Sequence, residues 1–130
     1  MKAVKFPLAG RERYLAFTVE AIFQIEEQFG GTGQLLETMQ KGGREGIAAA
    51  CRAAALLAEQ GELGRRGLGY DPQPIAEAEV ISATLSPGEA AALSMAIAAA
   101  VSLGYGREVE AENDEVDLGL AELEAQKKTG

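Results

Sequence analysis

The sequence predicts a mostly α-helical protein: an N-terminal β-hairpin followed by about five helices in one small bundle, with a flexible acidic C-terminal tail. Three observations support this prediction. The chain has 130 residues, enough for one domain to bury a core without disulfides or a structural metal. Apolar residues recur at helical spacing over much of residues 19–104, and acidic residues dominate after Arg107. We therefore expect one domain over residues 1–106 and a tail over residues 107–130.

The N-terminal segment carries the pattern of a β-hairpin. Ala3–Leu8 and Arg13–Phe17 flank the connection Ala9-Gly10-Arg11-Glu12, and apolar residues tend to alternate on both sides of it. Pro7 cannot donate a backbone hydrogen bond, which suits an edge strand. Because a two-stranded hairpin is marginally stable alone, it is expected to pack on helices or on another chain.

Two helices are expected after the hairpin. Thr18 is a suitable N-cap for the first, which ends near Phe29 because a pair of glycines follows. Thr32 is the expected cap of a second, shorter helix that stops at Gly42.

A longer Ala-rich helix is expected over residues 44–60, closed by Gly61. The next segment, Glu62–Pro74, contains several glycines and prolines, which predicts a flexible loop. Small side chains let helices approach closely but each buries little apolar area. The stability of such a core is therefore expected to be modest or to be shared with a partner.

Two further helices complete the predicted domain. Pro74 suits the first turn of a helix that runs to about Ala83. Ser86-Pro87-Gly88-Glu89 is the strongest local signal, because Ser at the cap, Pro at the first position and Glu at the third form a capping box. This helix is expected to run to Leu103, closed by Gly104. It is apolar nearly all round, so it is either central in the domain or covered by a partner.

The candidate functional surface is therefore one for binding another protein. We expect it to consist of the apolar part of the last helix together with two aromatic residues of the first helix, that is Phe23, Phe29, Leu93, Met95 and Ile97.

The residue types present argue against most enzyme chemistry. The chain has no His, which removes the commonest general base and the commonest nitrogen ligand for metals. Cys51 lies among alanines and is expected to be structural. Glu26 and Glu27 are adjacent, so on a helix they point in different directions. We expect no catalytic residues, no metal and no cofactor. An enzyme with carboxylate chemistry is the weakest alternative, and it would need Glu residues clustered in a cleft.

Charge and hydropathy narrow the class of partner. The net charge is −8, and it is uneven: residues 1–66 hold 9 basic and 8 acidic residues, whereas residues 67–130 hold 3 and 12. Such a chain repels nucleic-acid phosphates, so no nucleic-acid binding is expected. The apolar stretch Ala90–Leu103 is shorter than the roughly 20 residues of a membrane span. The N-terminal sequence lacks the apolar run of a secretory signal, so a cytoplasmic protein is expected.

The acidic tail offers two weaker patterns. Four of its acidic or amide residues imitate positions of a calcium loop, but Leu118 stands where that loop requires Gly, so calcium binding is not expected. Leu118, Leu120 and Leu123 have a spacing that suits a short helix, which could form on binding.

The order of these pieces resembles the small tail assembly chaperones of long-tailed phages, prophages and gene transfer agents. The resemblance rests on a hairpin followed by FTVEAIFQIEEQFGG, then LLETM, an Ala-rich helix, a gap and a late helix opened by LSPGE. The positions of the family's phrase are occupied here by Ile22, Ile25, Glu26, Glu27, Phe29, Gly30 and Gly31. The resemblance covers residues 2–104, and the acidic tail has no counterpart in it.

The resemblance implies a non-enzymatic chaperone in the cytoplasm of a bacterial host. Such a factor coats the long helical tape measure protein and helps to recruit tail tube subunits before they polymerise. An apolar helix surface that accepts another helix suits this role. The alternative is a structural or homo-oligomeric component of a phage tail or prophage particle, whose N-terminal edge strand would pair between chains.

Overall fold

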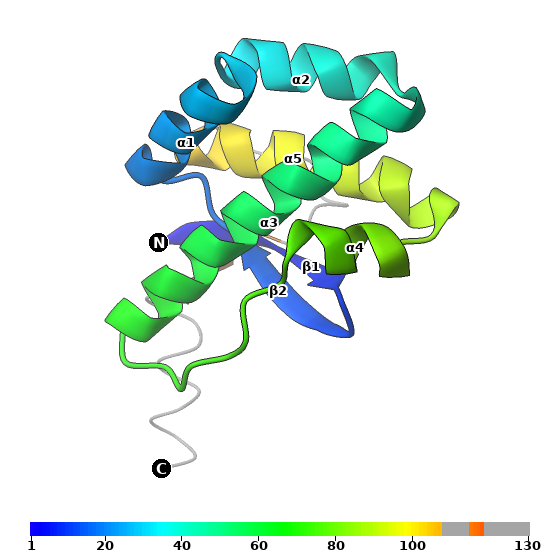
Figure 1. Cartoon of the computed structure of the whole chain (residues 1–130). Coiled ribbons are helices and arrows are strands. Elements are labelled where there is room, and N and C mark those ends of the chain that lie inside the picture. Colours follow the sequence, from blue (N-terminus) through cyan, green and yellow to red (C-terminus); the bar gives the residue numbers. More distant parts are fainter. Residues whose placement is uncertain (108–114, 119–130) are drawn as a thin grey trace.

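The computed structural model describes residues 1–107 and 115–118 (Figure 1). This part of the chain is mostly helical, with an N-terminal hairpin, as predicted, and with a third strand that was not predicted. The elements follow in the order β1 (Lys2–Leu8), β2 (Arg11–Leu15), α1 (Val19–Phe29), α2 (Thr32–Lys41), α3 (Gly43–Gly67), α4 (Ala78–Thr84), α5 (Pro87–Gly104) and β3 (Glu115–Asp117).

The hairpin is tighter than the sequence predicted. Only Ala9 and Gly10 connect β1 to β2, with φ angles of 50° and 83°. Two successive residues at positive φ are typical of the short turns whose twist matches that of the flanking strands. The expected four-residue connection was too long, because Arg11 and Glu12 already pair with β1. Pro7 lies in a part of β1 that pairs with β2 alone, as its missing N–H requires.

A third strand from the acidic segment completes the sheet, which has the strand order β2-β1-β3. β3 runs antiparallel to the start of β1. The N-terminal ammonium of Met1 forms an ion pair with Asp117, with 3.2 Å between the nitrogen and Oδ1. Leu118 is fully buried and packs with Ala3 and Ala16. The prediction of a flexible tail from residue 107 is therefore wrong for residues 115–118. Leu120, Leu123 and the rest of the tail lie outside the described residues.

The caps of α1 are confirmed, whereas that of α2 is corrected. The Thr18 hydroxyl accepts a hydrogen bond from the Ala21 N–H, and Gly30 ends α1 at φ 88°. Gly31 is the N-cap of α2, and no side chain caps this helix. Thr32 is already helical, because the two glycines complete the turn between the helices before it.

α3 is longer than predicted and does not end at Gly61. A Cβ atom on Gly61 would lie 1.7 Å from the carbonyl oxygen of Tyr14 in β2. Close by, the Ala16 N–H donates to the Leu57 carbonyl at 3.1 Å. Gly61 therefore permits α3 to lie directly against the outer edge of β2, and the helix continues to Gly67.

The fourth helix also differs from prediction, and the fifth agrees with it. α4 begins at Ala78, so Pro74 lies in the irregular segment before it. In α5, Ser86 and Glu89 form the predicted capping box, with both reciprocal hydrogen bonds present. The helix includes Gly104, one residue beyond the expected end.

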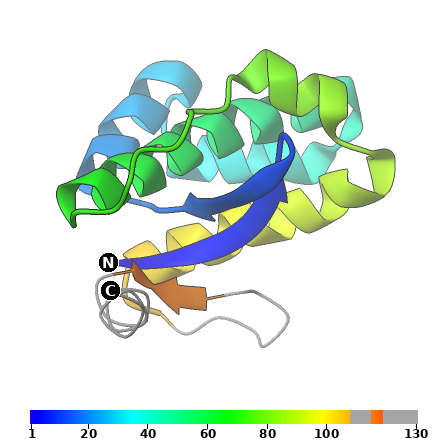
Figure 2. The same ribbon diagram turned by 90° about the horizontal axis from the view of Figure 1, so that it is seen from below.

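α3 is the centre of the arrangement. It contacts the other four helices and β2, and α5 packs on both α3 and β1. Figure 2 shows the sheet beside these two helices, with β3 at the sheet edge away from α3. The helices are thus grouped around α3 and a small sheet. The largest fully buried side chains belong to Val4, Leu15, Ile25, Leu35, Leu57, Ile81, Leu93, Ile97 and Leu118.

Candidate partner-binding surface

The structure places the five predicted surface residues in different environments. Leu93 and Ile97 are fully buried in the core. Met95 is 51% exposed, and Phe23 is 57% exposed. Phe29 is half-buried and packs against the core. The predicted surface is therefore not continuous, since Leu93 and Ile97 belong to the opposite side of α5 from Met95.

The exposed side of α5 is itself apolar and uncharged. Along it lie Ala91, Met95, Ala98, Ser102 and Tyr105. Successive members of this set are four, three, four and three residues apart, which is the spacing of a coiled-coil seam. Ser102 is half-buried and the other four are exposed. We refer to these five residues as the α5 outer face, which extends for roughly 21 Å at 1.5 Å per residue.

α5 is thus apolar on both sides but covered on one. Its inner side supplies Leu93, Ile97 and Val101 to the main core. Among the described residues, α5 is the one helix whose length and composition would allow it to cross a membrane. Here its inner side is part of a folded core, and a helix with one apolar side covered and one uncovered is typical of a protein-binding element.

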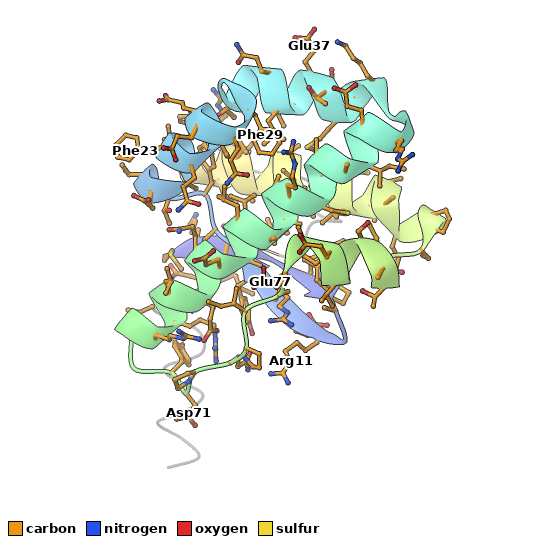
Figure 3. The ribbon with its side chains drawn as sticks, viewed as in Figure 1. Arg11, Phe23, Phe29, Glu37, Asp71 and Glu77 are labelled. Carbon is orange, nitrogen blue, oxygen red and sulfur yellow. The ribbon has the colours of Figure 1, made fainter. Side chains whose placement is uncertain are left out.

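The start of α1 adjoins the end of the α5 outer face. Phe17, just before α1, packs against Tyr105 with ring centroids 5.3 Å apart and the ring planes tilted by 55°. Val19, the first residue of α1, is 66% exposed, and Phe23, four residues later, is 57% exposed. Figure 3 shows Phe23 pointing away from the body of the protein. The end of the α5 outer face and the start of α1 are therefore joined by the Phe17–Tyr105 contact, and each carries exposed apolar side chains.

Phe29 has a partner within the chain. The guanidinium of Arg52 lies over its ring, 4.6 Å from the centroid. A cation over an aromatic face stabilises this arrangement by about 0.5–1 kcal/mol where it is exposed. Phe29 therefore joins α1 to α3, and only part of its ring is open to solvent.

A buried group of charges at the end of α3 was not predicted from the sequence. Both oxygens of Glu62 are engaged: Arg65 donates to one at 2.6 Å, and Arg66 donates to the other at 2.9 Å. The backbone N–H of Gln73 also donates to Glu62, at 2.7 Å. Arg65 lies over the rings of Tyr14 and Tyr70. The spacing of Glu62, Arg65 and Arg66, three and four residues apart, was the available signal.

These contacts give Glu62 a structural role. Burial raises the pKa of its carboxyl, but the hydrogen bonds from Gln73, Arg65 and Arg66 outweigh burial, so the pKa is lowered from its ordinary value. The charged form holds residues 71–74 against the end of α3, where Arg65 and Arg66 also donate to backbone carbonyls. In the segment Glu62–Pro74, which was predicted as a loop, residues 62–67 are thus helical, and the backbone of Asp71 and Gln73 is hydrogen-bonded to side chains of α3.

Two other side chains that could take part in catalysis or metal binding, those of Cys51 and Glu115, also have structural surroundings. Cys51 is buried, and burial raises the pKa of its thiol, with a smaller opposing effect from a hydrogen bond to Ser82. A thiol of this kind is a poor nucleophile at neutral pH. Glu115 pairs with Lys2 at 3.2 Å. Within residues 1–107 and 115–118, no group of three or more acidic or Cys side chains is placed to hold a metal ion.

The α5 outer face could have been found from the sequence. The 4-3-4-3 spacing from Ala91 to Tyr105 is visible there, but so is a second apolar stripe through Leu93, Ile97 and Val101. Larger side chains in the second stripe are the signal that it faces the core.

Comparison of the chain with protein-family models, with curated proteins and with solved structures finds no match.

Proposed function

We propose that this protein is a non-enzymatic assembly chaperone of a phage or prophage tail, which binds the helical tape measure protein and helps to recruit tail tube subunits in the bacterial cytoplasm. The observation that supports it most is the α5 outer face, an uncharged apolar helix surface at coiled-coil spacing. The client class follows from the resemblance of residues 2–104 to tail assembly chaperones.

The composition of the α5 outer face suits a long helical client. Ala91 and Ala98 allow a second helix to approach closely, while Met95 is flexible enough to pack against varied side chains. A tape measure helix that binds several copies would gain affinity through avidity, so each contact could remain weak. The net charge of −8 would keep such complexes apart in solution.

The alternative is a structural or homo-oligomeric tail component. The α5 outer face would allow it, because two copies of one apolar stripe can pack against each other. The edge-strand version of this alternative is less favoured, because α3 covers the outer edge of β2 and β3 covers the start of β1.

Co-expression tests the proposal. The tagged protein is expressed with the tail genes that adjoin its own, and the bound proteins are identified by mass spectrometry. We expect the tape measure protein to be captured, and we expect the tagged protein to be missing from mature particles. Capture of neither tape measure nor tube protein would contradict the chaperone. Retention in mature particles would favour the structural alternative.

A further inference from the structure

A groove on the outer side of α3 is separate from the α5 outer face and shares no residue with it. It has a volume of about 450 Å³ and lies between α1, α3 and the segment that leads into α4. In Figure 1, α5 passes behind α3, whereas α1 and α4 flank α3. The groove is therefore a second, independent concave surface.

The floor of the groove is apolar, and its two sides differ. Ala55 and Leu56 of α3, with Ala76, form the floor. The amides of Gln24 and Gln28 line the α1 side. Such a floor with polar sides suits an amphipathic segment, which places apolar side chains on the floor and polar ones at the rim.

The opposite side of the groove is acidic. Glu77 and Glu79 line it, and Glu59 lines the groove on α3; none of the three forms an ion pair within 4.0 Å with a residue that the structure describes. Figure 3 shows Glu77 beside α3, at the approach to α4. Arg52 is the basic residue that lines the groove, and its guanidinium is held over the Phe29 ring. The lining of the groove thus contains three carboxylates and one basic side chain, so it carries an excess of negative charge.

We propose that this groove binds a basic amphipathic segment of a partner protein. Apolar side chains of the segment lie on Ala55 and Leu56, and its Lys or Arg side chains pair with the three carboxylates. The acidic rim disfavours nucleic acids, and the apolar floor selects a segment with apolar side chains over a simple polycation. This proposal does not depend on the identity of the client of the α5 outer face.

Peptide binding to the full chain tests the groove. The probe is a fluorescent amphipathic helix of about 14 residues, with Leu on one side and Lys on the other, titrated at low and moderate salt and followed by anisotropy. Two comparison peptides replace every Lys by Glu or every Leu by Ser. We expect only the Leu/Lys peptide to bind, and its affinity to fall as salt rises, because its charged contacts are at a solvated rim.

Groove variants locate the binding. The double variant Glu77→Lys/Glu79→Lys is expected to weaken binding roughly tenfold or more at low salt, because attraction becomes repulsion. Ala55→Gln is expected to weaken it by filling the floor. The double variant Glu37→Lys/Glu45→Lys makes the same charge change outside the groove and is expected to change affinity less than about twofold. Circular dichroism and melting temperatures verify that each variant is folded.

Three results would overturn the proposal. One is unchanged affinity in the Glu77→Lys/Glu79→Lys variant, and another is equal binding of the Leu/Lys and Ser/Lys peptides, which would indicate unspecific charge attraction. The third concerns Lys127 and Lys128 of the chain itself. If the peptide binds only after Lys127→Ala/Lys128→Ala substitution, the occupant is the chain's own C-terminal segment rather than a partner.

Discussion

The two longest helices, α3 and α5, use their small residues in different ways. In α3, glycines and alanines bring the helix against every other helix and against the edge of β2. In α5, the small residues occur on both sides, and only the inner side belongs to the core, whereas Ala91, Met95 and Ala98 on the outer side are exposed. Small residues therefore allow close packing within the chain in α3, whereas on the outer side of α5 they leave an exposed surface.

This difference separates stability from binding. Substitutions at the closely packed positions of α3 and on the inner side of α5 are expected to change the free energy of unfolding. Substitutions on the α5 outer face are expected to leave it nearly unchanged and to affect partner binding instead. The following substitutions test this separation.

Gly61→Ala is expected to have the largest effect on stability. The added Cβ would meet the Tyr14 carbonyl oxygen at 1.7 Å, so either α3 or β2 must move. We expect a loss of about 4 kcal/mol or more, measured by urea unfolding. Gly67→Ala is the matched control, because nothing lies within 4 Å of its Cβ position. It is expected to be neutral or stabilising by up to about 1 kcal/mol. Equal effects at the two glycines would contradict the close contact of α3 with β2.

Leu93→Ala and Met95→Ala compare the two sides of α5. Leu93 is fully buried, so its truncation is expected to destabilise the protein by about 3 kcal/mol. Met95 is 51% exposed, and its truncation is expected to change stability by less than about 0.5 kcal/mol. Thermal and urea unfolding of both variants measures the difference. A large loss for Met95→Ala would mean that the outer face is covered within the chain.

Glu62→Gln tests the buried charges at the end of α3. It leaves Arg65 buried without its carboxylate, and we expect a loss of about 3 kcal/mol at neutral pH. Because the pKa of Glu62 is lowered on folding, its charge stabilises the protein above its ordinary pKa of 4.5. That contribution is lost as the pH falls through the lowered pKa. The difference between wild type and variant should therefore shrink below pH 4.5, whereas a constant difference would argue against this ionisation.

Ser86→Ala is expected to destabilise the protein less than Gly61→Ala, Leu93→Ala or Glu62→Gln. It removes the hydroxyl that accepts from the Glu89 N–H, and loss of such a cap costs about 1 kcal/mol. Ser94→Ala, in the interior of the same helix, is the control and is expected to cost less than about 0.5 kcal/mol. Equal losses would indicate that packing, and not the capping box, determines where α5 begins.

The features predicted correctly depend on residues close together in the sequence. The start and end of α1, the β-hairpin and the capping box of α5 each follow from a few neighbouring residues. Two of the predictions that failed depend on residues far apart. Gly61 was expected to end a helix, but its role is set by the Tyr14 backbone. The strand Glu115–Asp117 has no strand pattern of its own, and it forms by pairing with β1.

The candidate surface shows the same limit. The sequence indicated that α5 would be apolar on nearly all sides and placed Met95 in the binding surface. The larger side chains of the stripe through Leu93, Ile97 and Val101 were the signal that this stripe faces inward, but the prediction did not separate the two stripes, because both are apolar. Leu93 and Ile97 were therefore assigned to the surface, although they are buried.

The most direct test of the α5 outer face as the client-binding surface is capture of the tape measure protein by the Met95→Lys variant. The control is Ile47→Lys on α3, since Ile47 is 44% exposed and Met95 51%. We expect both variants to fold with the melting temperature of the wild type to within a few degrees. We expect Met95→Lys to lose most of the captured client and Ile47→Lys to retain it. Full capture by a folded Met95→Lys variant would contradict the assignment of this face to the client.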